Sequence, residues 1–103
     1  MAKQKDAPLL TLSVAASLLN MHPRTLMLYE KEGLVKPHRT STNRRLFSET
    51  DLGKVQFIQF LIDKENTNLA GIRVILNILE KTSSKIPTIR KELFPDFSEK
   101  ELI

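Results

Sequence analysis

The side chains with the clearest chemical signal in this sequence are basic, and they gather in one stretch. Between His22 and Arg45 the chain has six Lys or Arg residues and two Glu residues, a net charge of +4. The whole 103-residue chain carries the same net charge, so its other basic and acidic residues cancel. A basic excess confined to one segment is typical of a surface that binds phosphate groups. A solvated basic face is the other interpretation, so charge alone favours a nucleic-acid partner only modestly.

Patterns of catalytic and metal-binding residues are missing from the sequence. The chain has no cysteine, which excludes thiolate metal sites and thiol redox sensing and fits a reducing cytosol. His22 and His38 stand apart, and we interpret them as a helix-cap residue and a residue of a surface hairpin. The three glycines are dispersed, so no glycine-rich phosphate loop is present. We therefore expect no enzyme activity, no metal and no cofactor.

The composition indicates one small domain outside the membrane. No apolar run approaches the roughly 20 residues of a membrane-spanning helix. The start of the chain, MAKQKDAPLL, lacks the apolar core of a signal peptide, which predicts a cytoplasmic protein, here associated with the nucleoid. At 41% hydrophobic residues the core is small, and oligomerisation is an expected source of further stability.

Two short helices joined by a three-residue turn are predicted for residues 14–32. Ser13 is the expected N-cap of the first helix. Pro23 suits the first position of the second helix, where its missing N–H would be unpaired anyway. Gly33 ends that helix, since a left-handed residue costs glycine least. This spacing is typical of a helix-turn-helix, whose second helix enters the major groove of DNA. The expected buried face of the first helix comprises Val14, Ala15, Leu18 and Leu19.

The second helix has two distinct faces. At about 100° per residue, Leu26 and Tyr29 point inward, and the Tyr29 hydroxyl is expected to reach a backbone phosphate. Met27 and Leu28 are unusual on a solvated surface but suit contact with base methyl groups or sugars. A protein contact is the alternative for these two. The outward face comprises Arg24, Met27, Leu28 and Lys31.

A basic hairpin follows this helix. Leu34 to Pro37 is predicted to be extended, because a residue before proline avoids the helical region. A polar turn at 38–43 and a returning strand at 44–47 complete the hairpin, which is the wing of a winged helix-turn-helix. The predicted fold is mainly α, a winged helix-turn-helix with a small β-hairpin wing, followed by two to three helices. The predicted DNA-contacting residues are Arg24, Thr25, Met27, Leu28, Tyr29, Lys31, Lys36, His38, Arg39, Arg44 and Arg45.

The later helices carry their own start signals. Ser48 and Asp51 form a predicted capping box for a helix that runs to about Lys64. Asn68 is the expected N-cap of an amphipathic helix ending near Lys81. We divide the chain into a flexible arm at 1–8, a winged helix-turn-helix DNA-binding domain at 9–82 and a C-terminal dimerisation helix or tail at 83–103. The competing arrangement is that this tail folds back on the Ser48 helix, leaving a monomer that dimerises only on DNA.

These motifs resemble the MerR family of bacterial transcriptional regulators, roughly from Leu12 to Leu79. The resemblance rests on TLMLYE at 25–30, GLVKP at 33–37 with Arg39, and RRLFS at 44–48 with Asp51 and Leu52. NLAGI at 68–72 is similar to the branch of heat-shock repressors and Gram-positive nitrogen regulators.

The resemblance implies a dimer that bridges a pseudo-palindromic operator, often a promoter with a long spacer that the protein distorts. It also implies that Tyr29 and Arg45 hold phosphates. Two residues depart from the family, which usually has an arginine where Met27 stands and a second aromatic where Leu28 stands. The family's long dimerisation helix is reduced here to the segment near 86–93.

Our hypothesis is a sequence-specific regulator that binds double-stranded DNA as a homodimer. A protein effector is a further candidate partner. An excisionase-like protein that bends DNA is a second reading, and the helix after Asn68 favours the regulator. A winged-helix module that contacts protein instead of DNA is a third reading.

Overall fold

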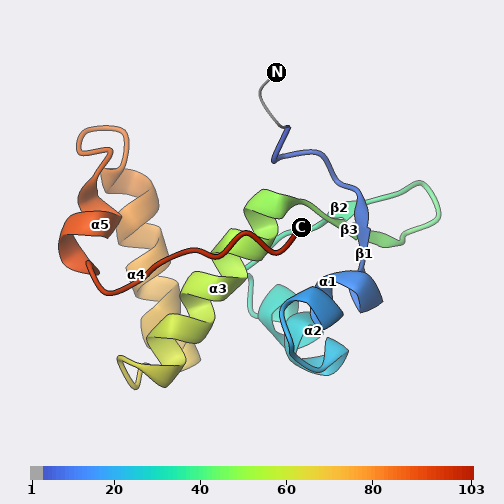
Figure 1. The fold of residues 1–103 in the computed structure, drawn as a ribbon, viewed down its shortest axis with the longest axis horizontal. Helices are drawn as coiled ribbons and strands as arrows, with labels where there is room; N and C mark the ends of the chain where they lie inside the picture. Colours follow the sequence, from blue (N-terminus) through green and yellow to red (C-terminus); the bar gives the residue numbers. More distant parts are fainter. Residues whose placement is uncertain (1–3) are drawn as a thin grey trace.

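The computed structural model describes residues 4–103 and confirms a mainly α winged helix-turn-helix (Figure 1). The described residues form five helices and one three-stranded antiparallel sheet. The elements in chain order are β1 Leu10–Thr11, α1 Leu12–Leu18, α2 Pro23–Lys31, β2 His38–Arg39, β3 Arg45–Phe47, α3 Glu49–Asp63, α4 Leu69–Thr82 and α5 Ile89–Leu93.

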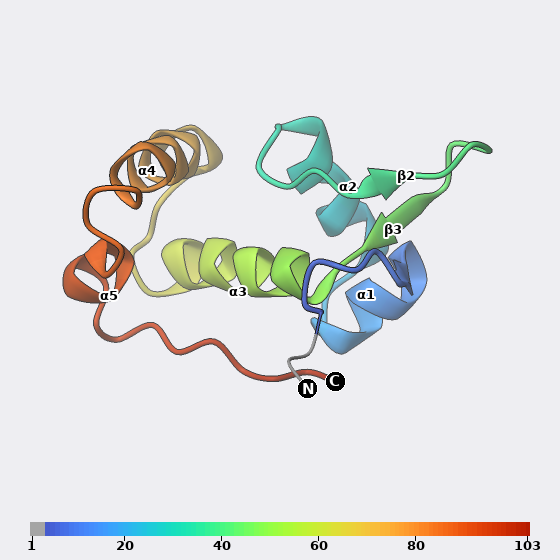
Figure 2. The ribbon, with the colours of Figure 1, turned by 90° about the horizontal axis from the view of Figure 1, so that it is seen from above.

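Helix α3 is the central element of the fold. Figure 2 shows α2 and α4 on one side of α3 and the C-terminal segment on the other. The predicted capping box starts this helix: the Asp51 N–H donates to Ser48 Oγ at 3.0 Å and the Ser48 N–H donates to Asp51 Oδ2 at 2.9 Å. The helix is covered on several sides, so most of its apolar residues are buried. The buried ones are Leu52, Val55, Phe57, Ile58 and Leu61.

Helix α1 begins two residues earlier than predicted. Thr11, not Ser13, is the N-cap, and its Oγ1 accepts from the Val14 N–H at 3.3 Å. The prediction that Val14 is buried is wrong, since its side chain is 46% exposed. Ala15 and Leu19 are buried, as predicted, and Ala16 is buried in place of Val14. The small alanine side chains allow a neighbouring helix to approach closely.

The sheet contains the predicted wing and one further strand. Strands β2 and β3 pair antiparallel, with Arg39 opposite Arg45. His38, expected in the turn, lies in β2, and Asn43 turns the chain with φ of +64°. Strand β1 pairs with the other edge of β3, giving the order β1-β3-β2. Phe47 at the end of β3 is fully buried, which anchors the wing in the core.

The C-terminal segment folds back along α3, which is the competing arrangement of the sequence analysis. The ring centroids of Phe94 and Phe97 lie 5.3 and 5.1 Å from that of Phe57. The amide of Gln56 donates to the Lys100 carbonyl at 3.0 Å and accepts from the Lys100 N–H at 2.8 Å. Much of the apolar surface that we expected to require a partner is thus covered within the chain.

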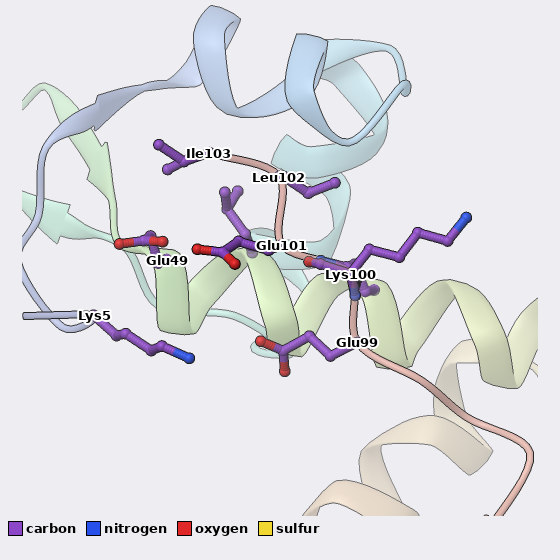
Figure 3. A pocket seen from close by; sticks show the side chains of 9 residues that line it. Lys5, Glu49, Glu99, Lys100, Glu101, Leu102 and Ile103 are labelled. Atoms are coloured by element: carbon purple, nitrogen blue, oxygen red, sulfur yellow. Dashed lines mark hydrogen bonds between the residues drawn. The ribbon is translucent and has the colours of Figure 1, made fainter. Parts of the chain in front are cut away.

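Residues 5–6 and the C-terminal residues both lie near the start of α3. Figure 3 shows the last residues, from Glu99 to Ile103, beside the first turns of α3 and close to Lys5. Residues 1–3 of the predicted arm lie outside the described residues. The Thr50 N–H donates to the Lys5 carbonyl at 3.0 Å, and the Thr50 hydroxyl donates to the Asp6 carboxylate. This part of the predicted loose arm is therefore bound to α3. Between residues 4 and 103 no helix is long and apolar enough to cross a membrane.

Candidate nucleic-acid interface

Helix α2 is fixed at both ends by local hydrogen bonds. His22 is its N-cap, as predicted, and the His22 Nδ1 accepts from the Arg24 N–H at 3.0 Å. At the other end Gly33 has φ of +74°, a conformation that favours glycine. The N–H groups of Leu34 and Gly33 donate to the carbonyls of Tyr29 and Glu30, both at 2.9 Å. These two bonds form a Schellman motif, so the helix stops at a defined residue.

The outward face of α2 joins the wing in one groove, which we call the α2–wing groove. Leu26 is fully buried, as predicted, and this fixes the rotation of the helix about its axis. The side chains on the opposite face are exposed. The groove is lined by Arg24, Met27, Leu28, Glu30, Lys31, Arg39 and Arg45.

Glu30 holds the wing against α2. Arg39 Nη2 donates to Glu30 Oε2 at 2.9 Å, and Arg45 Nε donates to Glu30 Oε1. The Glu30 side chain is 18% exposed, and burial acts to raise its pKa. The hydrogen bonds and positive charges of Arg45 and Arg39 outweigh burial, so the pKa of Glu30 is lowered. The sequence pattern did not predict this role for Glu30.

The Glu30→Gln variant is expected to lower the free energy of unfolding by about 1–2 kcal/mol at pH 7, because two charge-assisted hydrogen bonds lose their acceptor charge. The folded-state pKa of Glu30 lies below the unfolded one. The stabilisation is therefore present above the unfolded pKa and is lost as the pH falls through the folded pKa. Urea unfolding from pH 7 down to pH 3 should show the wild type and the variant converging in acid.

Glu80→Gln is the matched control, because the Glu80 side chain is exposed and makes no ion pair within residues 4–103. Its stability should follow the wild type at every pH. A constant difference between Glu30→Gln and the wild type across this range would contradict an electrostatic role for Glu30.

Four of the basic side chains that were predicted to contact DNA remain available to bind another molecule. Within residues 4–103 their side chains form no hydrogen bond or ion pair, and all four are exposed. Unpaired exposed cations are the groups that can exchange counterions for phosphates. The four are Arg24, Lys31, Lys36 and Arg44.

Tyr29 lies differently from the other predicted contact residues. It is 5% exposed and does not line the α2–wing groove. Burial, and then the negative charge of Asp63 on α3, raise the pKa of the Tyr29 hydroxyl. The ring is therefore a core residue, as predicted, and its phosphate contact stays a prediction. Thr25 is half-buried, and His38 is exposed on the wing.

Arg73 of α4 is a further residue that the sequence analysis missed. Its Nε and Nη2 donate to the Glu32 carbonyl at 3.2 and 2.9 Å, and Nη2 donates to Glu32 Oε2 at 2.7 Å. A cation at the C-terminus of a helix is stabilised by the helix dipole. Arg73 thus ties α4 to the end of α2 and supports the position of the groove.

The remaining polar clusters give no indication of a metal site. Within residues 4–103 no group of three or more His, Asp or Glu side chains could hold a metal ion. The pocket between the tail and α3 mixes Lys5 and Lys100 with carboxylates (Figure 3).

Comparison with known proteins decides the family. Residues 10–78 match the family model of the MerR HTH family regulatory proteins. The chain belongs to the MerR family. Members of the MerR family bind DNA and regulate transcription, and the family is not enzymatic, so the sequence predictions of family and of no enzyme activity are confirmed.

Two relatives represent the predicted branch of the MerR family. The putative heat shock protein HspR of Streptomyces coelicolor is 40% identical over 74 residues, which cover 72% of this chain and 49% of HspR. The HTH-type transcriptional regulator GlnR of Bacillus cereus is 34% identical over 99 residues, which cover 96% of this chain and 74% of GlnR. This MerR-family chain therefore spans about half the length of the Streptomyces relative.

Proposed function

We propose that this MerR-family chain binds a pseudo-palindromic promoter operator as a homodimer, with α2 in the major groove and the wing on the phosphate backbone. The observation that carries the proposal is the α2–wing groove, in which recognition-helix and wing cations line one surface. A chromosomal operator would place the protein in the bacterial cytoplasm, at the nucleoid.

The two sides of the groove would make different contacts. On α2, Arg24 and Thr25 lie in the first turn, the part of a recognition helix that usually meets base edges. The polar side chains of the wing and of the segment before it would contact phosphates, which set affinity and register without reading sequence. This second group comprises Lys36, His38, Arg39, Arg44 and Arg45, and the Tyr29 hydroxyl would join it.

Sequencing of genomic fragments captured by the purified chain tests this proposal. We expect enrichment of an inverted repeat within promoters, with half-sites about one helical turn apart. Enrichment of a recombination site would favour the excisionase-like alternative instead. Absence of any enriched duplex would favour the protein-interaction module.

The wing is expected to act through phosphates. Arg44→Ala should weaken binding to every duplex nearly equally and reduce the slope of log affinity against log salt by about 0.9. Arg45→Ala should reduce the slope less, because Glu30 already neutralises part of the Arg45 charge. Fluorescence anisotropy between 50 and 200 mM salt, roughly the range over which such contacts respond, measures both slopes. An unchanged slope for Arg44→Ala would exclude a phosphate contact.

The proposed homodimer rests on an exposed apolar face of α4. Val74 and Ile78 lie one turn apart and are 58% and 52% exposed. Ile86 and Leu93, in the segment that follows, are 42% and 56% exposed. A second copy would cover these side chains and present two reading helices to one face of the DNA. A protein effector stays a prediction.

Ile78→Glu is therefore expected to convert a dimer into a monomer, because it places a charge in the proposed interface. Light scattering at tens of micromolar protein measures the mass of each variant. Leu9→Glu is the matched control, since Leu9 is 76% exposed and directly precedes β1, which lies across the molecule from α4 (Figure 1). A monomeric wild type would refute the pre-formed dimer, and a dimeric Ile78→Glu would move the interface elsewhere.

A further inference from the structure

Two apolar side chains lie within the basic face of α2. Met27 and Leu28 are 39% and 41% exposed, and both line the α2–wing groove. At about 100° per residue, Arg24 projects between them when the helix is viewed along its axis. Adjacent exposed methionine and leucine side chains gain free energy of burial when a bound molecule covers them.

The charges around these residues indicate what that molecule is. Arg24 and Lys31 share the face, and Arg39 and Arg45 form the opposite wall of the groove. An acidic partner with apolar groups between its charges would fit. Duplex DNA has this pattern in its major groove. Phosphates flank the base edges there, and the thymine C5-methyl is the exposed apolar group.

We propose that Met27 and Leu28 select A·T base pairs by packing against thymine C5-methyl groups. The inference rests on the proposed function, in which α2 enters the major groove. Neither side chain can hydrogen-bond a base edge, so among contacts that distinguish base pairs, burial against a thymine methyl group is the one available to them.

The two residues differ in how strictly they select. Methionine is unbranched and flexible, so it adapts to small shifts of the base step. Leucine is stiffer, and its contact depends more on the exact position of the methyl group. Substitutions at Leu28 should therefore change the range of operator sequences that the protein binds more than substitutions at Met27 do.

Uracil substitution tests the proposal directly, because deoxyuridine pairs with adenine as thymidine does but lacks the methyl group. Each thymine of a captured operator is replaced singly, and affinities are measured by anisotropy. For the wild type, loss of a contacted methyl is expected to weaken binding about fourfold. Met27→Ala and Leu28→Ala should each bind the thymine operator more weakly and lose the response to one set of uracil positions.

Lys31→Ala is the matched control, because Lys31 shares the groove but carries a charge instead of an apolar group. It should weaken binding in a salt-dependent way and keep the full response to uracil. If the wild type binds the thymine and uracil operators with equal affinity, the protein does not read thymine methyl groups. Duplex binding, and with it the proposed function, would still stand. A uracil penalty that survives in the Met27→Ala, Leu28→Ala double variant overturns the assignment to these residues. Failure to bind any duplex overturns the proposed function as well.

Discussion

Phe57→Ala is expected to lower the free energy of unfolding by about 3–5 kcal/mol, because it removes a large buried ring and leaves a cavity. Phe57 is 2% exposed at the junction of α3 with the C-terminal segment. Its ring centroid lies 6.2 Å from Phe60, 5.3 Å from Phe94 and 5.1 Å from Phe97. The Arg90 guanidinium lies over the same ring at 5.6 Å. One substitution therefore removes the Phe57 contacts with Phe94, Phe97 and Arg90, while Phe60 keeps its own ring contacts with Phe94 and Phe97 at 6.3 and 5.4 Å.

Urea unfolding followed by circular dichroism measures this loss. Leu9→Ala is the control, since Leu9 is 76% exposed and lies outside the proposed dimer interface, and its cost should stay within about 0.5 kcal/mol. A loss of less than about 1 kcal/mol for Phe57→Ala would mean that the segment leaves α3 readily in solution, because a well-packed ring costs more to remove.

Helix starts and stops whose hydrogen-bond partners lie nearby in the chain were predictable from the sequence. The Ser48–Asp51 capping box, the Asn68 cap and the Gly33 stop each depend on groups no more than five residues away. The start of α1 was predicted wrongly, because Thr11 and Ser13 are both suitable caps. The pairing of Leu10 and Thr11 with β3 ends at Thr11 and decides between them. Leu10 pairs with Phe47 and Thr11 with Leu46, which are far apart in the sequence. Local sequence patterns do not encode pairing over such a separation.

Side-chain pairs between distant elements were not predictable. The outward face of α2 followed from periodicity, because burial of Leu26 fixes it. The bonds from Glu30 to Arg39 and Arg45 require α2 and the wing to be placed first. The same holds for Arg73 with Glu32, which are 41 residues apart. The sequence offered α3 as one of two surfaces for the tail, but only the fold shows that Phe94 and Phe97 pack there.

Arg24→Ala is expected to weaken binding to the preferred operator by about 1–3 kcal/mol, the contribution of a bidentate arginine–guanine pair. The Arg24 backbone is held in the first turn of α2 by the His22 side chain. Its own side chain is exposed in the α2–wing groove and forms no hydrogen bond or ion pair within residues 4–103. Binding to non-specific duplex should weaken much less, because no base edge is read there.

Arg24→Lys separates charge from geometry. Lysine keeps the positive charge but lacks the planar fork that binds guanine bidentately, so most of the operator-specific loss should remain. The salt slope of Arg24→Lys should match that of the wild type, since the number of neutralised phosphates is unchanged. Competition assays with the captured operator and a scrambled duplex measure both quantities. Equal losses on the two duplexes would place Arg24 on a phosphate, and specificity would then have to come from DNA shape.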